Sequence, residues 1–202
     1  MKFTANHEIV LASQSPRRKE LLQTLGLAFQ TVPSTKDEPD PAGFKTAMGY
    51  VIECAAQKAK EVAKKHRSAV VIGSDTIVVL DGEILLKPKD KAQAMQFLHK
   101  LSGRSHDVIT AITVLYGKEE MSFYELAKVT FFELSEEWIE AYTDTSDPYD
   151  KAGAYGIQTA SKLFVEKING DYNTVVGLPI ASLAQKLAQA GYISLEKSQV
   201  QC

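Results

Sequence analysis

The stretch IVLASQSPRRKELL, residues 9–22, joins a short apolar run to a helix start and thereby sets the kind of fold to expect. Residues 9–12 are apolar and predict a buried strand. The turn after them carries two hydroxyl groups, a helix-starting proline and two cations: Ser13, Ser15, Pro16, Arg17 and Arg18. Serines favour the cap of a helix and proline its first position, where free N–H groups carry partial positive charge. This strand-to-helix turn therefore predicts an anion site, with phosphate as the natural ligand.

An ordinary helix N-cap explains the same residues. In that interpretation a serine caps an amphipathic helix whose Leu21, Leu22 and Leu25 face the core, while the two arginines stay solvated. Short motifs of this length also arise often by chance. The choice between the two interpretations depends on the rest of the chain.

Composition limits the possible partners. The chain has 202 residues, of which 45% are hydrophobic and 24% charged, as expected for one globular domain or two tightly joined lobes. We treat residues 1–202 as a single domain. The formal net charge of −2 argues against a broad nucleic-acid-binding surface but is compatible with a local basic pocket. We therefore expect a phosphorylated small molecule as partner and no nucleic acid.

Cysteine and histidine usage points to a reducing compartment. Cys54 lies within a helical pattern and Cys202 at the chain end, so the two form neither a disulfide framework nor a CxxC metal site. No apolar stretch approaches the length of a membrane span, and the residues before position 9 are too polar for a signal peptide. We expect a cytoplasmic protein without membrane contact. None of the four histidines has a ligand spacing, and His106 alone lies beside a plausible site.

The alternation of apolar runs and helical patterns predicts an α/β fold with a mixed sheet. Strands are expected at residues 9–12, 29–32, 70–73, 76–80, 106–116 and 123–134, and a hairpin turn at Asp81-Gly82. Helices are expected at residues 44–66, 91–101 and 178–190, with another that opens at Ser135. Residues 33–41 are rich in proline and aspartate and read as a mobile surface loop.

A carboxylate interrupts the apolar strand pattern at Gly73-Ser74-Asp75-Thr76. A charge among valines and isoleucines is costly, so we expect Asp75 either to hold a divalent cation or to act as a general base. The alternative is an Asp-Thr turn that simply ends the strand.

Cations recur at the edges of the expected elements. Lys58, Lys87 and Arg104, taken singly, fit solvated surface charges. Together with Arg17 and Arg18 they could ring a triphosphate, which needs several cations and usually a metal to balance its charge.

The segment DKAGAYGIQ, residues 150–158, has the composition of a loop that lies against a flat base. Its glycines permit close approach, Tyr155 could stack, and the Gln158 amide offers a donor and an acceptor. Gly170-Asp171-Tyr172 and Gly177-Leu178-Pro179 could complete a wall of the cleft. Plain turns would explain all three segments equally well.

Seven segments in this order resemble the Maf family of nucleoside triphosphate pyrophosphatases. They are ASQSPRRKELL (12–22), QKA (57–59), GSDT (73–76), KP (87–88), LSGRSH (101–106), residues 150–158, and GDY with GLP (170–172 and 177–179). The resemblance covers nearly the whole chain. It implies a mixed twisted sheet flanked by helices, with two lobes around a cleft, and often a homodimer.

The resemblance also implies a reaction, the cleavage of a nucleoside triphosphate to the monophosphate and pyrophosphate by in-line attack of water. Asp75 matches the family's proton acceptor, and Mg²⁺ or Mn²⁺ would be held by Asp75 with Glu38, or with Asp37, because residues 35–39 match the family only loosely. Arg17, Thr76 and Gln158 match the positions that the family associates with base selection, and Thr76 with Gln158 resembles the branch that acts on dTTP and UTP rather than on 7-methyl-GTP. The residues expected to bind substrate are Ser13, Ser15, Arg17, Arg18, Lys58, Thr76, Lys87 and Gln158.

Two other functions stay open at this point. Maf proteins are also linked to septum formation, so the chain could be a nucleotide-binding regulator without essential turnover. A carboxylate inside a phosphate-binding cluster argues against pure binding, because it opposes an anion unless a metal intervenes. The other alternative keeps the chemistry and changes the pocket, as in an enzyme that removes deaminated purines such as inosine triphosphate.

Overall fold

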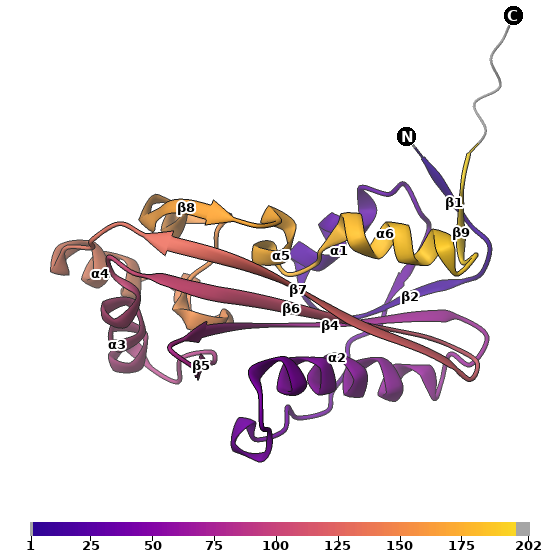
Figure 1. The fold of residues 1–202 in the computed structure, drawn as a ribbon, viewed down its shortest axis with the longest axis horizontal. Helices are drawn as coiled ribbons and strands as arrows, with labels where there is room; N and C mark the ends of the chain where they lie inside the picture. The colour runs from indigo at the N-terminus through magenta and orange to yellow at the C-terminus, as the bar shows by residue number, and fades with distance from the viewer. Residues whose placement is uncertain (1, 197–202) are drawn as a thin grey trace, which may run out of the picture.

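A computed structural model describes residues 2–196 and shows a twisted mixed sheet with helices on both faces (Figure 1). Cys202 lies outside the described residues. The strands are β1 (Phe3–Ala5), β2 (Ile9–Ala12), β3 (Gln30–Thr31), β4 (Val70–Leu80), β5 (Glu83–Leu85), β6 (Ser105–Tyr116), β7 (Glu119–Phe131), β8 (Val165–Asn169) and β9 (Ile193–Leu195). The α-helices are α1 (Pro16–Gln23), α2 (Ala47–Ala63), α3 (Lys91–Leu101), α4 (Glu136–Thr143), α5 (Tyr172–Val176) and α6 (Ile180–Gln189). Four short 3₁₀ turns are η1 (Pro41–Gly43), η2 (Asp147–Asp150), η3 (Ala152–Ala154) and η4 (Ala160–Phe164).

The main sheet changes from parallel to antiparallel at β4. Among residues 2–196 its strand order is β3-β2-β4-β6-β7-β8, and β5 pairs with one end of β4. β2, β3 and β4 are parallel because helices α1 and α2 carry the chain back between them. The other pairs are antiparallel: β4–β5 and β6–β7 are hairpins, whereas the connection from β4 to β6 contains β5 and α3 and that from β7 to β8 contains α4. β1 and β9 form a separate antiparallel pair.

β4 is one continuous strand, so the predicted break at residues 73–76 is wrong. The glycine at position 73 explains why the sequence pattern predicts a break. A Cβ at this position would lie 2.3 Å from the carbonyl oxygen of Ala55 and 2.8 Å from the nitrogen of Ala59, both in the backbone of α2. The glycine is thus required for helix α2 to pack directly against the sheet, not for a turn.

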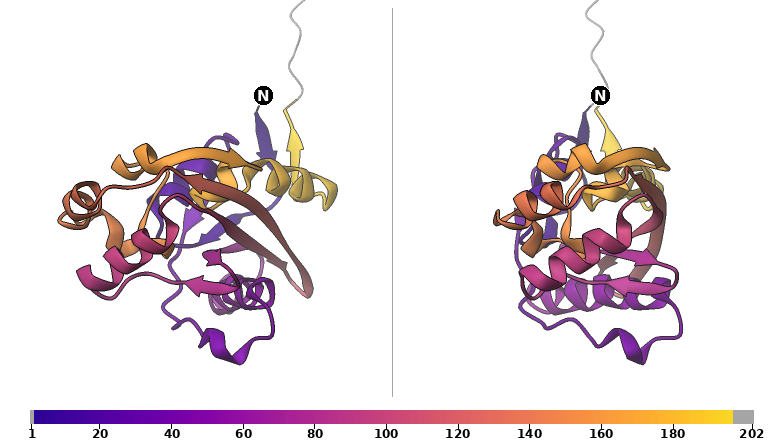
Figure 2. Two further views of the ribbon diagram at one scale, coloured as in Figure 1. Left: turned by 60° about the vertical axis from the view of Figure 1, so that its left-hand side comes forward. Right: turned by 90° about the vertical axis from the view of Figure 1, so that its left-hand side faces the viewer.

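Helices cover the two faces of the sheet differently. Helix α2 lies along one face, and α1, α5 and α6 lie on the other (Figures 1 and 2). Buried apolar residues gather in one cluster around β2, α1 and α6 and in another around α3, α4 and η3. These clusters lie toward opposite ends of the long strands and correspond to the two expected lobes.

Most predicted elements are present, and the differences lie at their ends. Helix α2 is shorter than residues 44–66, because Thr46 caps it by accepting a hydrogen bond from the Gly49 nitrogen. The β6–β7 turn is tighter than predicted, with Tyr116 paired with Glu119. The short elements β1, β8, β9 and α5 were not predicted. No helix in residues 2–196 is long and apolar enough to span a membrane.

Candidate active site

A cavity of about 390 Å³ lies between the start of α1 and residues 150–158, within the range usual for small-molecule sites. Apart from Arg104 and Asp37, it is lined by the residues that the sequence assigned to substrate or metal: Ser13, Ser15, Arg17, Arg18, Glu38, Lys58, Asp75, Thr76, Lys87 and Gln158. Six of its lining residues are cations, namely Arg17, Arg18, Lys36, Lys58, Lys87 and Lys151, against three acids, Glu38, Asp75 and Asp150. The cavity therefore has a local positive charge in a chain of net charge −2 and suits a polyanion.

The cavity opens where the sheet has a gap. β2 pairs with β4 only as far as Ala12 opposite Gly73, and β5 begins to pair at Leu85 opposite Val78. In the described part of the chain, residues 74–77 of β4 therefore have a neighbouring strand, β6, on one side only. Alternation then points Asp75 toward α2, and Ser74 and Thr76 toward α1 and α5.

Asp75 is held by a lysine from α2. The Lys58 Nζ atom donates to Asp75 Oδ1 at 2.7 Å and to Glu38 Oε1 at 2.9 Å. Only 9% of the Asp75 side chain is exposed. Burial alone would lower the pKa of Lys58, but the charges of Asp75 and Glu38 and the hydrogen bond to Asp75 together raise that pKa above its usual value. Burial likewise opposes ionisation of Glu38, and Lys58 nonetheless holds the pKa of Glu38 below its usual value. The three charges form one coupled cluster.

The two carboxylates suit a hard divalent cation. Glu38 and Asp75 both lie within hydrogen-bond distance of a single ammonium, so their oxygens already converge on one positive charge. Residues 2–196 contain no group of three or more His, Cys, Asp or Glu side chains that could hold a metal. Mg²⁺ is commonly bound through one or two carboxylates, with water and substrate phosphates completing its shell. The residues therefore fit such an ion, whereas Asp37 does not line the cavity.

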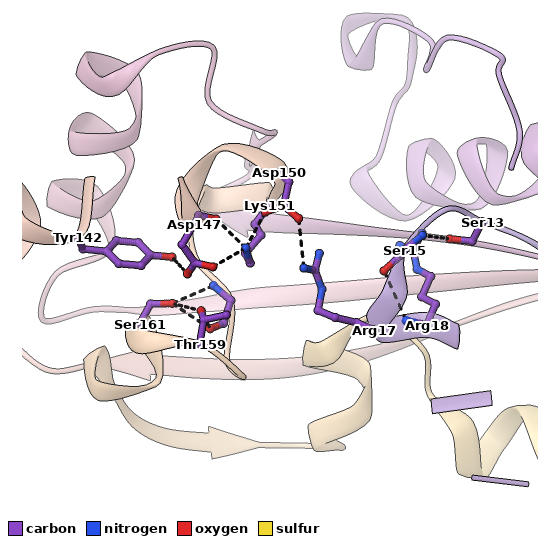
Figure 3. Close-up of polar contacts among 11 residues, drawn as sticks. Ser13, Ser15, Arg17, Arg18, Tyr142, Asp147, Asp150, Lys151, Thr159 and Ser161 are labelled. Atoms are coloured by element: carbon purple, nitrogen blue, oxygen red, sulfur yellow. Dashed lines mark hydrogen bonds and ion pairs between the residues drawn. The ribbon is translucent and has the colours of Figure 1, made fainter. Parts of the chain in front are cut away.

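The start of α1 combines a helix cap with an arginine pair. Ser15 Oγ accepts a hydrogen bond from the Arg18 nitrogen, and Ser13 Oγ accepts one from the Ser15 nitrogen. The N-cap interpretation is thus correct, and the same capped end also lines the cavity. The Arg18 Nε atom donates to the carbonyl of Gly177 at 2.9 Å, and its Nη2 atom lies 3.9 Å from Asp75 Oδ1. Figure 3 shows Arg17 directed across the cavity toward Asp150.

An ion cluster anchors the opposite wall. Lys151 is only 7% exposed, and its Nζ atom donates to the Asp147 carbonyl at 2.6 Å, to Asp147 Oδ1 at 2.9 Å and to Asp150 Oδ1 at 2.6 Å. Tyr142 donates to the other Asp147 oxygen, and Arg17 to the other Asp150 oxygen at 3.2 Å (Figure 3). All three N–H donors of the Lys151 ammonium group therefore bind oxygens of residues 147–150, so Lys151 stabilises the conformation of this loop.

Residues 150–158 pack more tightly than a plain surface turn. Gly153 and Ala154 both have positive φ, of 68° and 62°. A Cβ on Gly153 would meet the Val78 side chain at 2.9 Å, and one on Gly156 the Lys151 stem at 2.5 Å. The two glycines thus serve close packing of the loop on the sheet and on its own lysine.

Tyr155 belongs mainly to the core. It is 5% exposed, its ring meets Phe131 edge-on, and its hydroxyl lies 2.7 Å from His106 Nε2. Little of the ring is free for the expected stacking on a base. Burial lowers the pKa of His106 to about 4 and so keeps its ring neutral. Gln158, by contrast, is exposed at the cavity.

Arg104 does not belong to the site. It forms an exposed ion pair with Asp81 at the β4–β5 turn and is not among the lining residues. The sequence also missed site residues. Lys36 and Ser34 line the cavity from the segment interpreted as a mobile loop, where Glu61 accepts hydrogen bonds from the backbone nitrogens of Thr35 and Lys36. The serine and threonine that precede Lys36 were the available signal for an anchored loop.

Comparisons with known proteins agree with this geometry. A family model described as "Maf-like protein" matches residues 8–190. A Bacillus cytotoxicus protein named "dTTP/UTP pyrophosphatase" is 46% identical over 182 residues, which is 90% of this chain and 95% of the relative. A Bacillus mycoides protein of the same name is 45% identical over the same shares of the two chains.

A solved structure shares the fold at low sequence identity. The Staphylococcus aureus Ham1 protein is 18% identical, with a TM-score of 0.53 over 91% of this chain and 99% of that chain. The likeness extends over nearly the full length of both proteins and concerns the architecture alone.

Proposed function

The chain belongs to the Maf family, and on that premise we propose that it hydrolyses dTTP and UTP to the nucleoside monophosphate and pyrophosphate. The observation that carries the proposal is the placement of a buried carboxylate, Asp75, among the cations of a polyanion-sized cavity. A site for binding alone gains nothing from that carboxylate. The names of relatives at 46% and 45% identity support the choice of substrate.

In this proposal Asp75 receives the proton of the attacking water. In residues 2–196 both cations near Asp75 contact its Oδ1 atom, Lys58 at 2.7 Å and Arg18 at 3.9 Å. We assign Oδ2 as the proton acceptor, because it is the oxygen not used in these contacts. Water attacks the α-phosphorus in line with the departing pyrophosphate, and the proton leaves the water as the new P–O bond forms.

The cations of the cavity neutralise the phosphates. Arg17, Arg18, Lys58 and Lys87 come from three different parts of the chain, so they can contact more than one phosphate group. Ser13 and Ser15 place the capped helix end beside them. A divalent cation, Mg²⁺ or Mn²⁺, would be held by Glu38 and Asp75, and when bound it would offset the charge that develops on the phosphate oxygens.

Base recognition is assigned to the Gln158 amide. A uracil or thymine edge presents an acceptor, a donor and an acceptor, and an amide can meet two neighbouring groups of that pattern. Gln158 is exposed at the cavity and is carried by a loop that the Lys151 cluster anchors. ATP lacks the acceptor–donor–acceptor pattern, and we expect it to be a poor substrate.

Product analysis tests the proposal. Purified protein is incubated with Mg²⁺ and each of dTTP, UTP, ATP, ITP and 7-methyl-GTP, and the products are separated. We expect dTMP or UMP with pyrophosphate, and loss of turnover in EDTA. UDP with orthophosphate would contradict the bond assignment, faster turnover of ITP would indicate the purine enzyme, and tight binding without turnover would indicate the regulator.

The proposal also includes the oligomeric state and the cellular location. We propose a homodimer, which sedimentation equilibrium measures directly, and a monomer at micromolar concentration would exclude it. A cytoplasmic location agrees with the free, buried thiol of Cys54. Localisation of the tagged full chain in cells tests it.

A further inference from the structure

The side chain of Arg18 is fixed at two atoms on one edge of its guanidinium group. Its Nε atom donates to the Gly177 carbonyl at 2.9 Å, and its Nη2 atom donates to Thr76 Oγ1 at 3.0 Å. The same Thr76 oxygen lies 2.9 Å from Thr110 Oγ1, and Thr110 Oγ1 donates to the carbonyl of Thr174 at 2.7 Å. We call Arg18, Thr76, Thr110 and the two carbonyls the Arg18 clamp.

Counting protons settles the direction of the bond between the two threonines. A hydroxyl has one proton and two acceptor positions. Thr110 uses its proton on the Thr174 carbonyl, so in the Thr76–Thr110 bond the donor is Thr76. Thr76 then accepts from Arg18 with one of its lone pairs. Its hydroxyl has no proton left for a carbonyl oxygen of a base.

The clamp is built into the sheet. Thr76 and Thr110 are directly opposite each other in the β4–β6 register, which places their side chains on the same face. Thr110 and Thr174 are fully buried. Asp171 caps α5 by accepting hydrogen bonds from the Thr174 nitrogen and hydroxyl, and Ser74 donates to the Gly177 carbonyl at 3.1 Å. Hydrogen bonds thus fix the Gly177 carbonyl directly and the Thr174 residue through its nitrogen and hydroxyl.

We infer that Thr110 is a positioning residue for Arg18 and acts on it through the hydroxyl of Thr76. The inference deepens the proposed function and rests on it for its kinetic consequence. With one edge of the guanidinium engaged, the rest of the group, with its remaining N–H donors, is oriented before a triphosphate arrives. A fixed arginine loses less conformational entropy on binding a phosphate than a mobile one.

The Arg18 clamp and base reading make different kinetic predictions. If Thr110 acts through an arginine that contacts phosphate, its loss slows every nucleoside triphosphate by the same factor. If Thr110 instead supports contacts to the base, its loss changes the ranking of substrates. The role of Thr110 is therefore decided by ratios of kcat/KM between a pyrimidine and a purine nucleotide, not by the size of the loss.

The central variant is Thr110→Val, which keeps the shape of the side chain and removes the hydroxyl. We expect kcat/KM to fall about tenfold for UTP and for ITP alike, with the UTP to ITP ratio unchanged, because these two bases present different polar edges. Thr113→Val is the matched control, because Thr113 is fully buried on the same strand and bonds to Ser122 away from the cavity. Thr110→Ser restores the hydroxyl and should recover most of the loss.

A double-mutant cycle tests whether Thr110 acts through Arg18. In an Arg18→Lys background the clamp lacks its guanidinium, so we expect Thr110→Val to change kcat/KM by less than about twofold. Additive losses, or a changed UTP to ITP ratio in Thr110→Val alone, would overturn the inference. Melting temperatures of all variants identify any that fail to fold.

A second measurement does not depend on turnover. The Arg18 Nε–H signal of the ¹⁵N-labelled apoprotein, assigned by its loss in Arg18→Lys, should exchange slowly with water because it is hydrogen-bonded to Gly177. Thr110→Val should broaden it or speed its exchange, and Thr113→Val should not. An unchanged signal in Thr110→Val would refute the clamp even in an active enzyme. Absence of pyrophosphatase activity in the wild type would refute the proposed function while leaving this signal interpretable.

Discussion

The two walls of the cavity are built in opposite ways. The wall that carries Asp75 and Lys58 consists of a central strand and a long helix in direct backbone contact at Gly73. The wall that carries Gln158 is a loop with consecutive positive φ angles at Gly153 and Ala154. We call them the strand wall and the loop wall. Packing between two regular elements fixes the first, whereas the second is an irregular loop held by the ion cluster around Lys151 and by the packing of Gly153 and Tyr155 on the core.

The two kinds of wall suit two different requirements of the proposed reaction, catalysis and base recognition. Proton transfer and charge stabilisation need side chains held within a fraction of an ångström, which regular elements provide. Base recognition can be altered without disturbing that geometry when its contacts lie on a separate loop. The comparison therefore predicts that changes in the strand wall reduce turnover for all substrates, and that changes in the loop wall alter substrate choice and local stability.

The largest effect is expected from the strand wall. Asp75→Asn keeps the volume and removes the charge, so kcat should fall on the order of 10²-fold or more for every substrate. Steady-state kinetics with dTTP and UTP measure it. Asp107→Asn is a matched control, because Asp107 also lies on a strand and pairs with a lysine, Lys128, at 2.6 Å. A folded Asp75→Asn enzyme with near wild-type kcat would remove Asp75 from the mechanism.

The next effect sharpens the role of the loop wall. Gln158→Glu replaces the amide donor with an acceptor, which should repel a base carbonyl and cost roughly 1 to 3 kcal/mol in kcat/KM for UTP. The ranking of substrates should change, whereas kcat for the best remaining substrate should change little. Gln185→Glu on the exposed part of α6 controls for the added charge. An unchanged ranking would mean that Gln158 does not read the base.

Stability should also distinguish the two walls. Lys151→Met leaves Asp147 and Asp150 without their shared ammonium. Because both aspartates are partly exposed, we expect a loss of about 1 to 3 kcal/mol, or roughly 2 to 10 °C in Tm. Lys100→Met, which breaks a surface pair with Glu83, should shift Tm by less than about 2 °C. Equal shifts in calorimetry would show that the loop does not depend on the cluster.

The smallest effects concern pH. Despite the opposing effect of burial, hydrogen bonds to Thr159 and Lys151 lower the pKa of Asp147 below its usual value of 3.8. A lowered carboxyl pKa stabilises the fold above the unfolded value, and this stability is lost as pH falls through the folded value. Lys58 has a pKa raised above 10.5, so its contribution is complete below that pH and is lost as pH rises through the folded value.

The alkaline limb of a Tm-against-pH curve therefore reports on the strand wall, whereas the acid limb reports on both walls, because Lys58 also lowers the pKa of Glu38. Asp147→Asn should flatten the acid limb alone, by a few degrees at about pH 3. Lys58→Met should flatten the alkaline limb by a few degrees at about pH 11 and the acid limb in part. Scanning calorimetry across this range measures both. If Asp147→Asn also flattened the alkaline limb, the walls would not be electrostatically independent.

More of the strand wall than of the loop wall could be predicted from the sequence. The spacing of apolar residues and the presence of helix-capping residues determine where regular elements form. The sequence therefore predicted closely β2, the helix start at Pro16 and helix α3. The contacts of Lys58 with Asp75 and Glu38 join residues 17 and 20 positions apart, and no local pattern encodes that convergence. The resemblance to the family, and not periodicity, brought these residues together.

The loop wall shows the limit of local reasoning. The expectation that Tyr155 stacks on a base follows from its residue type and stays a prediction, since Tyr155 lines the cavity. Its burial against Phe131 and His106, which lie far away in the sequence, could not be predicted from the loop itself. The break predicted at Gly73 has the same origin, because the residue type was interpreted without knowledge of its packing partner, helix α2. A glycine gives the same local signal whether it makes a turn or receives a helix backbone, and only the packing of α2 distinguishes the two.

The gap in the sheet beside residues 74–77 also bears on self-association. An unpaired strand edge is a template on which another chain can add a strand and begin aggregation. Here β2 and β5 flank the open part of β4, so it extends over residues 74–77 alone. A strand from another molecule cannot align along so short a stretch without colliding with those neighbours. The protein can thus keep backbone and side chains of a central strand open to a small ligand without creating, at this gap, an edge on which a fibril could grow.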